Sequence, residues 1–295
     1  KKIDTSHFKM KYGGEIKDFN PDEYLTKEEQ NLYEDKYLQY AIVTIKKALN
    51  DAGLSIDEIR NDNVSIVLST CNGGLLTGED LYRWKHGQSD KAYNEQMNIQ
   101  AQYYGFGRAI SSYFKLTCDI WIVTTACSSS TGAIGLAKSL IDRGYCKTVI
   151  VGGSDSMALS NMAGFDALGA TSSEAVSPFS EPVGLNVGEA SCFWVVEEME
   201  KAILRKARCY ARISGYSTAL DAHHPTAPDP RGEGVYRTIS MALDDSGYGI
   251  EDLGCINAHG TGTEVNDKCE TRGIARFIDD KNIPAISLKS FFGHC

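Results

Sequence analysis

Apolar positions near the start of the chain recur at the spacing of one helical face. Between residues 36 and 50, five of them lie at positions i, i+3, i+4, i+7 and i+11: Leu38, Ala41, Ile42, Ile45 and Leu49. This periodicity predicts an amphipathic helix. Gly53 predicts its end, because glycine readily takes the left-handed conformation of a helix terminus. The largely apolar run Val64–Leu68 then predicts a buried strand.

The alternation of strand and helix continues along the chain. A strand at 120–123 precedes a helix predicted over 128–143, which Gly144 ends. The apolar stripe of this helix comprises Ala133, Leu136, Ala137, Leu140 and Ile141. Short apolar runs at 148–153 and 192–196 predict two more strands. This order is typical of an α/β chain whose central sheet is covered by helices.

Two distant segments of the chain resemble each other. Residues 48–59 and 242–253 are identical at five of twelve positions, and five further positions exchange similar residue types. Each segment ends an amphipathic helix and precedes an apolar run, Val64–Leu68 in one case and Cys255–Ala258 in the other. We interpret this match as an internal duplication of an α/β unit.

Composition and charge narrow the functional classes. The 295 residues are 42% hydrophobic and 23% charged, with a net charge of −9, so the chain is globular and acidic. No run of Lys and Arg exceeds two residues, which argues against nucleic acid as a partner. No stretch of eighteen apolar residues occurs, which argues against a membrane-spanning segment.

The nine cysteines fit neither a metal site nor a disulfide framework. Their number is odd and no two follow a C-x-x-C spacing. We therefore expect free thiols in a reducing compartment, the cytoplasm, and no bound metal.

The first motif with chemical potential is Thr124–Gly132, which contains Cys127. A strand runs into a tight turn, and a helix of small residues starts just after the cysteine. A thiol in front of a helix is favoured as the thiolate by the helix dipole and the free N–H groups. The alternative interpretation is a buried cysteine capped by serines.

The second motif is Asn257–Asp267, in which a strand ends at His259. A glycine-rich turn with Thr261 and Thr263 follows, and then a helix capped near Asn266 or Asp267. The pattern favours a surface on which a polar, extended ligand lies against the backbone. A structural histidine and a mononucleotide-binding loop are the alternatives, although the lysine of a P-loop is missing.

The third motif is Ser287–Cys295, in which Lys289 and His294 follow a short apolar strand at 283–288. Cys127, His259, Lys289 and His294 together provide a nucleophile, two imidazoles and an ammonium group. Hydrolysis of a thioester by a Cys–His pair and decarboxylative condensation both fit these groups. Hydrolysis needs neither the second histidine nor the lysine.

The three motifs together carry a resemblance to a known family. T-A-C-S-S-S at 125–130, H-G-T-G-T at 259–263 with Asp267 and Glu270 following, and K-S-x-x-G-H at 289–294 occur in the order found in elongating 3-oxoacyl-[acyl-carrier-protein] synthases. Gly188–Ala190 and Asp221–Pro228 are also similar to family stretches. The chain resembles these condensing enzymes over essentially its whole length.

The resemblance implies a thiolase-like fold of two duplicated, layered αβαβα halves. It implies residues 1–200 as the N-terminal half with the nucleophile, and 201–295 as a partial C-terminal half with the histidines. Cys127 would accept the acyl group, His259 and His294 would promote decarboxylation, and Lys289 would order them. Thr261 and Thr263 would hold the phosphopantetheine arm, with Asp267 and Glu270 as structural residues near the site.

The family also implies partners: an acyl carrier protein bearing phosphopantetheine thioesters and a second copy of the chain in a homodimer, with no cofactor. The serines after Cys127 favour polyketide-type relatives, while fatty-acid elongation stays open. Three alternative functions stay open: a thiolase, a thioester hydrolase and a non-catalytic partner subunit. The presence of Cys127 argues against the non-catalytic subunit.

The chain departs from the family pattern in three places. The usual N-terminal strand and the glycine-rich loop expected beyond Cys295 are absent, which predicts that the sequence is a fragment whose own activity is in doubt. The stretch Phe179–Gly184 lacks the arginine that the family carries there.

Overall fold

A computed structural model describes residues 5–90, 92–224, 227–278 and 283–295. The chain divides into two compact units. The four-stranded unit comprises residues 16–160 and 189–211 with Cys295, and the two-stranded unit comprises the chain up to Glu15, residues 161–188 and residues 212–294. Of the Asp221–Pro228 stretch, Pro225 and Thr226 lie outside the described residues.

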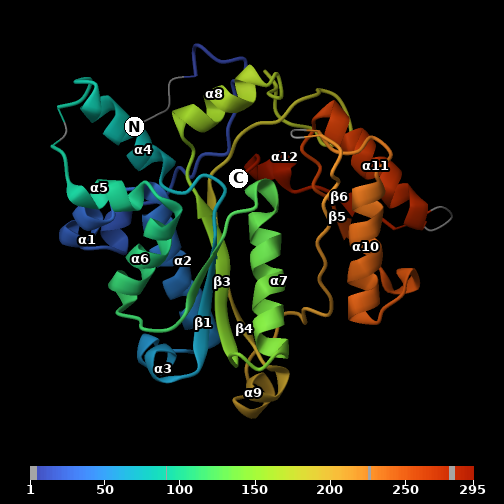
Figure 1. Ribbon diagram of the computed structural model, residues 1–295, viewed down its shortest axis with the longest axis horizontal. Coiled ribbons are helices and arrows are strands. Elements are labelled where there is room, and N and C mark those ends of the chain that lie inside the picture. The colour runs from blue at the N-terminus through green and yellow to red at the C-terminus, as the bar shows by residue number, and fades with distance from the viewer. Residues whose placement is uncertain (1–4, 91, 225–226, 279–282) are drawn as a thin grey trace. The chain divides into compact units, whose positions relative to one another are not determined.

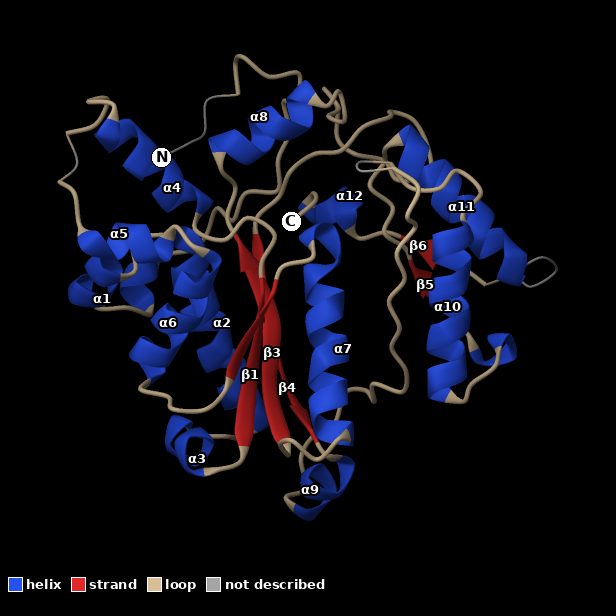
Figure 2. Cartoon of the chain, viewed as in Figure 1, coloured by secondary structure: helices blue, strands red, loops and turns tan. Residues whose placement is uncertain are grey.

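The four-stranded unit is built on one mixed sheet with the order β2-β1-β3-β4 (Figure 2). Its strands are β1 (Val64–Ser69), β2 (Ile120–Val123), β3 (Thr148–Asp155) and β4 (Ala190–Glu197). β2, β1 and β3 run parallel, and β4 pairs antiparallel with β3. All four strands predicted in this unit are therefore confirmed.

Helices cover both faces of this sheet, as the sequence predicts (Figure 1). The helices of the unit are α1 (Lys27–Leu32), α2 (Lys36–Ala52), α3 (Ile56–Asn61), α4 (Leu75–Lys85), α5 (Glu95–Gln100), α6 (Tyr103–Phe114), α7 (Ser129–Asp142) and α9 (Met199–Leu204). One core packs α2 and α6 against Ile66, Leu68 and Ile150. The other packs α7 against Val67 and Val151. Alternate residues of β1 and β3 thus enter opposite cores.

Both long helices of this unit end as their sequences predict. The five predicted apolar residues of α2 are buried, and Gly53 follows the helix at φ 66°. Gly144 follows α7 at φ 69°. Of the predicted α7 stripe, Ala133, Ala137 and Leu140 are buried, while Leu136 and Ile141 are partly buried against the same core.

The two-stranded unit pairs β5 (Ile256–Asn257) with β6 (Ala285–Ile286) in parallel. Its helices are α10 (Glu233–Ser246), α11 (Glu264–Ile278) and α12 (Lys289–Phe292), and α8 (Leu159–Ala167) begins in the four-stranded unit. Both strands are shorter than the predicted 255–258 and 283–288. The predicted helix start at Asn266 or Asp267 is wrong, because the Asp267 N–H already donates to the Thr263 carbonyl (2.9 Å) within the first turn of α11.

The two segments that match in sequence adopt the same succession of elements. α2 and α10 each end at a left-handed glycine, Gly53 at φ 66° and Gly247 at φ 71°. A short helix or 3₁₀ turn follows, at Ile56–Asn61 and Ile250–Asp252, and then β1 or β5.

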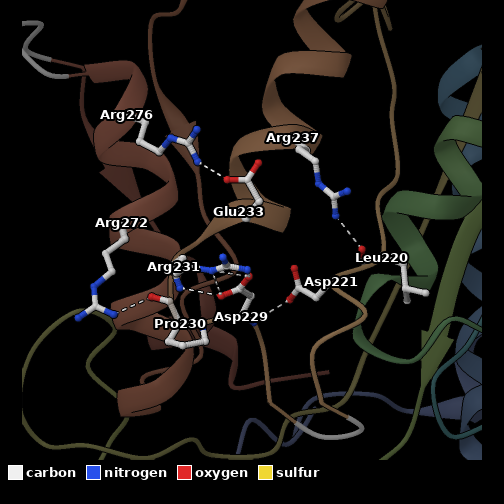
Figure 3. A network of polar contacts seen from close by, with 9 residues as sticks. All are labelled: Leu220, Asp221, Asp229, Pro230, Arg231, Glu233, Arg237, Arg272 and Arg276. Carbon is white, nitrogen blue, oxygen red and sulfur yellow. Dashed lines mark hydrogen bonds and ion pairs between the residues drawn. The ribbon is translucent and has the colours of Figure 1, made fainter.

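Arginine contacts hold α10, α11 and the segment before α10 together (Figure 3). Arg276 pairs with Glu233 (2.6 Å), and Arg272 donates to the Pro230 carbonyl (2.6 Å). Arg231 donates to both oxygens of Asp229 and lowers the pKa of that carboxyl to about 2. α11 is thereby fixed beside the segment that it packs on. Within the described residues, no helix has the length and apolar character needed to cross a membrane.

Candidate active site

Cys127 lies in a strained turn at the carboxyl end of β2. The turn is one 3₁₀ segment, Ala126–Ser128, directly in front of α7. Ala126 has φ 52°, a left-handed conformation that residues with a Cβ rarely adopt. The side chain of Cys127 is exposed, so the alternative of a buried cysteine is wrong.

Neutral hydroxyl groups close this turn. The Ser129 Oγ donates to the Ala126 carbonyl (2.6 Å) and accepts from the Thr125 N–H (2.8 Å). The Ser128 Oγ donates to the Thr125 carbonyl (2.8 Å). The serines that follow the cysteine therefore fix the backbone of the turn, and the thiol stands before the first free N–H groups of α7.

A second thiol that sequence reasoning missed lies beside the first. The side chain of Cys71, two residues beyond β1, is hydrogen-bonded to that of Cys127. This contact, burial and the nearby Asp155 carboxylate raise the pKa of Cys71. Asp155 accepts from the Cys71 N–H and the Asn72 N–H, both at 2.8 Å, and so fixes the backbone that carries this thiol.

In the two-stranded unit, Glu270 of α11 holds the loop of His259. Its carboxylate accepts from the His259 N–H (2.5 Å) and the Gly260 N–H (2.7 Å). Ser287, from the end of β6, donates to the Gly260 carbonyl (2.9 Å). Glu270 is itself buried, so both backbone donors are satisfied away from water.

Asp267 holds the next part of the same loop. It accepts from the Gly262 N–H (3.2 Å) and from the Phe179 N–H (2.6 Å). The Gly184 N–H donates to the Gly262 carbonyl (2.7 Å). The stretch Phe179–Gly184, where the family arginine is missing, thus lies against the glycine-rich loop.

The two threonines of the loop point toward each other. Their hydroxyl oxygens are 2.8 Å apart, and the Thr263 N–H donates to the Thr261 Oγ1 (3.3 Å). Thr261 is buried and Thr263 is partly exposed. The pair presents hydroxyl groups beside the histidine, as a polar ligand would require.

His294 lies beside His259. The two ring centroids are 5.4 Å apart and the rings are nearly perpendicular. The His294 N–H donates to the Asn186 carbonyl, and the His294 carbonyl accepts from the Gly188 N–H, both at 2.7 Å. Lys289 donates to the His259 carbonyl (2.7 Å). Two neighbouring imidazoles can donate hydrogen bonds to one developing negative charge.

The structure thus brings together seven of the eight predicted site residues. His259, Thr261, Thr263, Asp267, Glu270, Lys289 and His294 lie in the two-stranded unit, and Cys127 lies in the four-stranded unit. Sequence reasoning missed Asn186 and Ser287 as supports, because both act through contacts with residues far away in the sequence. The only signal for Ser287 was its place at the end of a predicted strand.

Family models match the chain almost from end to end. The model of the beta-ketoacyl synthase N-terminal domain matches residues 2–202. The model of the beta-ketoacyl synthase C-terminal domain matches residues 210–295.

Named relatives agree with these models. The chain is 34% identical to a 3-oxoacyl-[acyl-carrier-protein] synthase 2 of Synechocystis, covering 99% of this chain and 73% of that protein. It is similar to a chain in the solved ishigamide ketosynthase/chain length factor (TM-score 0.89, 29% identity, 99% of this chain and 72% of that chain). It is also similar to a chain in the solved complex of a type II polyketide synthase acyl-carrier protein with its ketosynthase. The TM-score is 0.86 at 25% identity, covering 97% of this chain and 72% of that chain.

Proposed function

The chain belongs to the beta-ketoacyl synthase family, and from that premise we propose which residues carry each step of its reaction. The fold is the thiolase-like α/β fold, and the protein is a condensing enzyme of fatty-acid or polyketide chain elongation. It transfers an acyl group to a cysteine, decarboxylates a malonyl thioester and joins the two by Claisen condensation to a 3-oxoacyl thioester.

Cys127 is the acyl acceptor. Its sulfur attacks the acyl thioester carbonyl, the new carbon–sulfur bond forms, and the carrier thiol leaves with a proton. The exposure of Cys127 and its position in front of α7 support this role, since a helix N-terminus favours the thiolate.

His259 and His294 promote decarboxylation. When the malonyl carboxylate leaves as CO2, its electron pair becomes an enolate, and the thioester oxygen takes up negative charge. Imidazole N–H groups stabilise that charge more strongly in the transition state than in the ground state. The adjacency of the two rings, 5.4 Å between centroids, is the observation that carries this assignment.

The other site residues position these groups. Lys289 holds the His259 carbonyl and places a positive charge beside the imidazoles. Asp267 and Glu270 fix the loop, and Thr261 and Thr263 bind the amides of the phosphopantetheine arm.

The same premise supports a domain division and partners. Residues 1–200 form the half with Cys127, and residues 201–295 belong to the half with the histidines. An acyl carrier protein delivers the substrates, as the solved relative with its carrier protein suggests. The protein acts in the cytoplasm as a homodimer, which native mass spectrometry tests by the mass of the assembly.

Three substitutions separate condensation from hydrolysis. His259→Ala and His294→Ala each slow decarboxylation of malonyl-carrier protein about 10²–10³-fold, yet keep much of the acylation of Cys127. Cys127→Gln loses acylation but still decarboxylates, because a neutral amide resembles the acylated thiol. Mass spectrometry of the acyl-enzyme and release of labelled CO2 measure the two steps.

His86→Ala is the matched control, since His86 is an exposed histidine at the end of α4. It should match the parent protein in both steps. A His259 or His294 variant that decarboxylates at the parent rate would contradict the assignment. Collapse of acylation in only one histidine variant would indicate a Cys–His hydrolase instead.

A further inference from the structure

Two neighbouring strands bring two thiols to the same edge of the sheet. β1 and β2 are parallel, with Ser69 opposite Val123, and the Thr70 N–H donates to the Val123 carbonyl (3.3 Å). Cys71 follows the end of β1 by two residues, and Cys127 follows the end of β2 by four. The carboxyl ends of parallel strands meet at one edge, so both cysteines emerge there.

Both cysteine backbones are fixed. Asp155 accepts from the Thr70 Oγ1 (2.6 Å) and the Cys71 N–H (2.8 Å), and Tyr103 donates to the Cys71 carbonyl (3.3 Å). The turn of Cys127 is closed by Ser129. The two side chains are hydrogen-bonded to each other, and neither is in a disulfide. The thiols are therefore held as neighbours.

The two thiols differ in exposure. Cys127 is exposed in front of α7, whereas Cys71 is partly buried and its pKa is raised, first of all by its contact with Cys127. An oxidant from solution therefore reacts first with the exposed Cys127, and the partly buried Cys71 is the neighbouring thiol that can react next.

We infer that hydrogen peroxide converts Cys71 and Cys127 into a reversible disulfide. The Cys127 thiolate attacks one peroxide oxygen, the O–O bond breaks, and the products are a Cys127 sulfenic acid and hydroxide, which takes a proton to become water. The Cys71 sulfur then attacks the sulfenic sulfur, forming the S–S bond and releasing a second water. In sum, two thiols are oxidised and one peroxide is reduced to two waters.

This disulfide both blocks and protects Cys127. A sulfenic acid without a neighbouring thiol proceeds to the sulfinic acid, which thiol reductants do not reverse. With Cys71 beside it, oxidation stops at a form that dithiothreitol reduces. The loss of condensation rests on the proposed role of Cys127, whereas formation of the disulfide does not.

The pair is tested in the full-length protein by titration with hydrogen peroxide, alkylation of remaining thiols and peptide mapping without reductant. We expect loss of two hydrogen atoms and one cross-linked pair of peptides containing Cys71 and Cys127. Cleavage after Trp121 separates Cys127 from Cys118, which rules out a false assignment. Condensing activity is lost on treatment and returns with dithiothreitol.

Cys71→Ser provides the decisive variant. It keeps the untreated condensing activity, but after peroxide its Cys127 gains two or three oxygen atoms, and dithiothreitol restores little activity. Cys209→Ser, which removes an exposed cysteine of the same unit, is the control and should behave like the parent.

Two outcomes would overturn the inference. One is a cross-link that joins Cys127 to any cysteine other than Cys71, or no cross-link at all. The other is full recovery of the Cys71→Ser variant. Mapping of the unsubstituted protein decides the first even if the variant does not fold. A mapped disulfide in a protein without condensing activity would refute the proposed function and leave the disulfide standing.

Discussion

The loops after β1 and after β5 follow related segments of sequence but are held by different elements. Each comes after a helix, a left-handed glycine, a short turn and a strand. In the four-stranded unit, Asp155 from the end of β3 accepts from the Cys71 and Asn72 N–H groups. In the two-stranded unit, Glu270 from α11 accepts from the His259 and Gly260 N–H groups.

This comparison shows which residues determine the chemistry of the loop after each strand. Both loops need an acceptor for successive backbone donors that would otherwise be buried without partners. A carboxylate supplies it in each case, but from a neighbouring strand in one unit and from the following helix in the other. The two copies share only the helix, the turn and the strand. The loop residues that follow the strand differ, and they provide a thiol in one copy and a histidine in the other.

The largest expected effect follows removal of the helix-borne carboxylate. Glu270→Ala leaves the His259 and Gly260 donors unsatisfied and should lower the free energy of unfolding by about 2–5 kcal/mol. Amide exchange at these two positions should accelerate, and decarboxylation should fall. Glu264→Ala, at an exposed ion pair of the same helix, should change stability by less than about 0.5 kcal/mol. Similar losses in both variants would show that the loop does not depend on Glu270.

Removal of the strand-borne carboxylate, Asp155, should have the next largest effect. The contribution of this residue to the free energy of unfolding should depend on pH. Asp155→Asn replaces one acceptor oxygen by a donor and should lower the free energy of unfolding by about 1–3 kcal/mol at neutral pH. Burial is the main cause that raises the pKa of Asp155 above the ordinary value of 3.8. As the pH rises above that value, the unfolded chain loses its proton first, so the stability of the parent should fall.

Urea unfolding between acidic and neutral pH measures this dependence. The variant should lack the Asp155 contribution to the decrease, and its deficit relative to the parent should be largest at low pH, where the carboxyl is neutral in both states. A parent whose stability rises through this window while the variant stays flat would contradict the assigned direction.

Asp267→Asn should have a smaller effect on stability and a more specific one on substrate use. The amide keeps one acceptor for the Gly262 or Phe179 N–H but not for both, which costs about 1–2 kcal/mol. Because Thr261 and Thr263 belong to this loop, KM for the malonyl-carrier substrate should rise more than kcat falls. Lys268→Ala, at an exposed position of α11, should leave both parameters unchanged.

The smallest effects should come from the two glycines, and they should be equal. Gly53→Ala and Gly247→Ala each force an alanine into a left-handed conformation, at a cost of about 1 kcal/mol. An added Cβ meets no atom within 4 Å at either position, so no clash adds to that cost. Urea unfolding measures the loss of stability in each variant. Two clearly different losses would show that the two helix ends are not equivalent.

Sequence patterns located the elements of this fold better than the contacts of its site. α2, β1 and β2 follow from apolar periodicity and a terminal glycine, because each buries a continuous stripe of its own residues. The start of α11 was missed because Thr263 begins the first turn before any capping residue that the motif suggested. Asp155, Cys71 and Asn186 were missed because their partners are distant in sequence, and no local pattern encodes a carboxylate that crosses from one element to another.

The backbone hydrogen bonds around His294 have a consequence for the order of folding. Gly14 donates to Val187, and Gly188 to His294, so three segments from nearly the whole described chain close against one another. Bringing these distant segments together costs conformational entropy before their contacts form. This step of folding is therefore slow. During synthesis, the sheet over residues 64–155 can assemble long before residue 294 emerges. The imidazole pair should therefore acquire its structure after that sheet, and amide protection at Gly14, Gly188 and His294 should develop together.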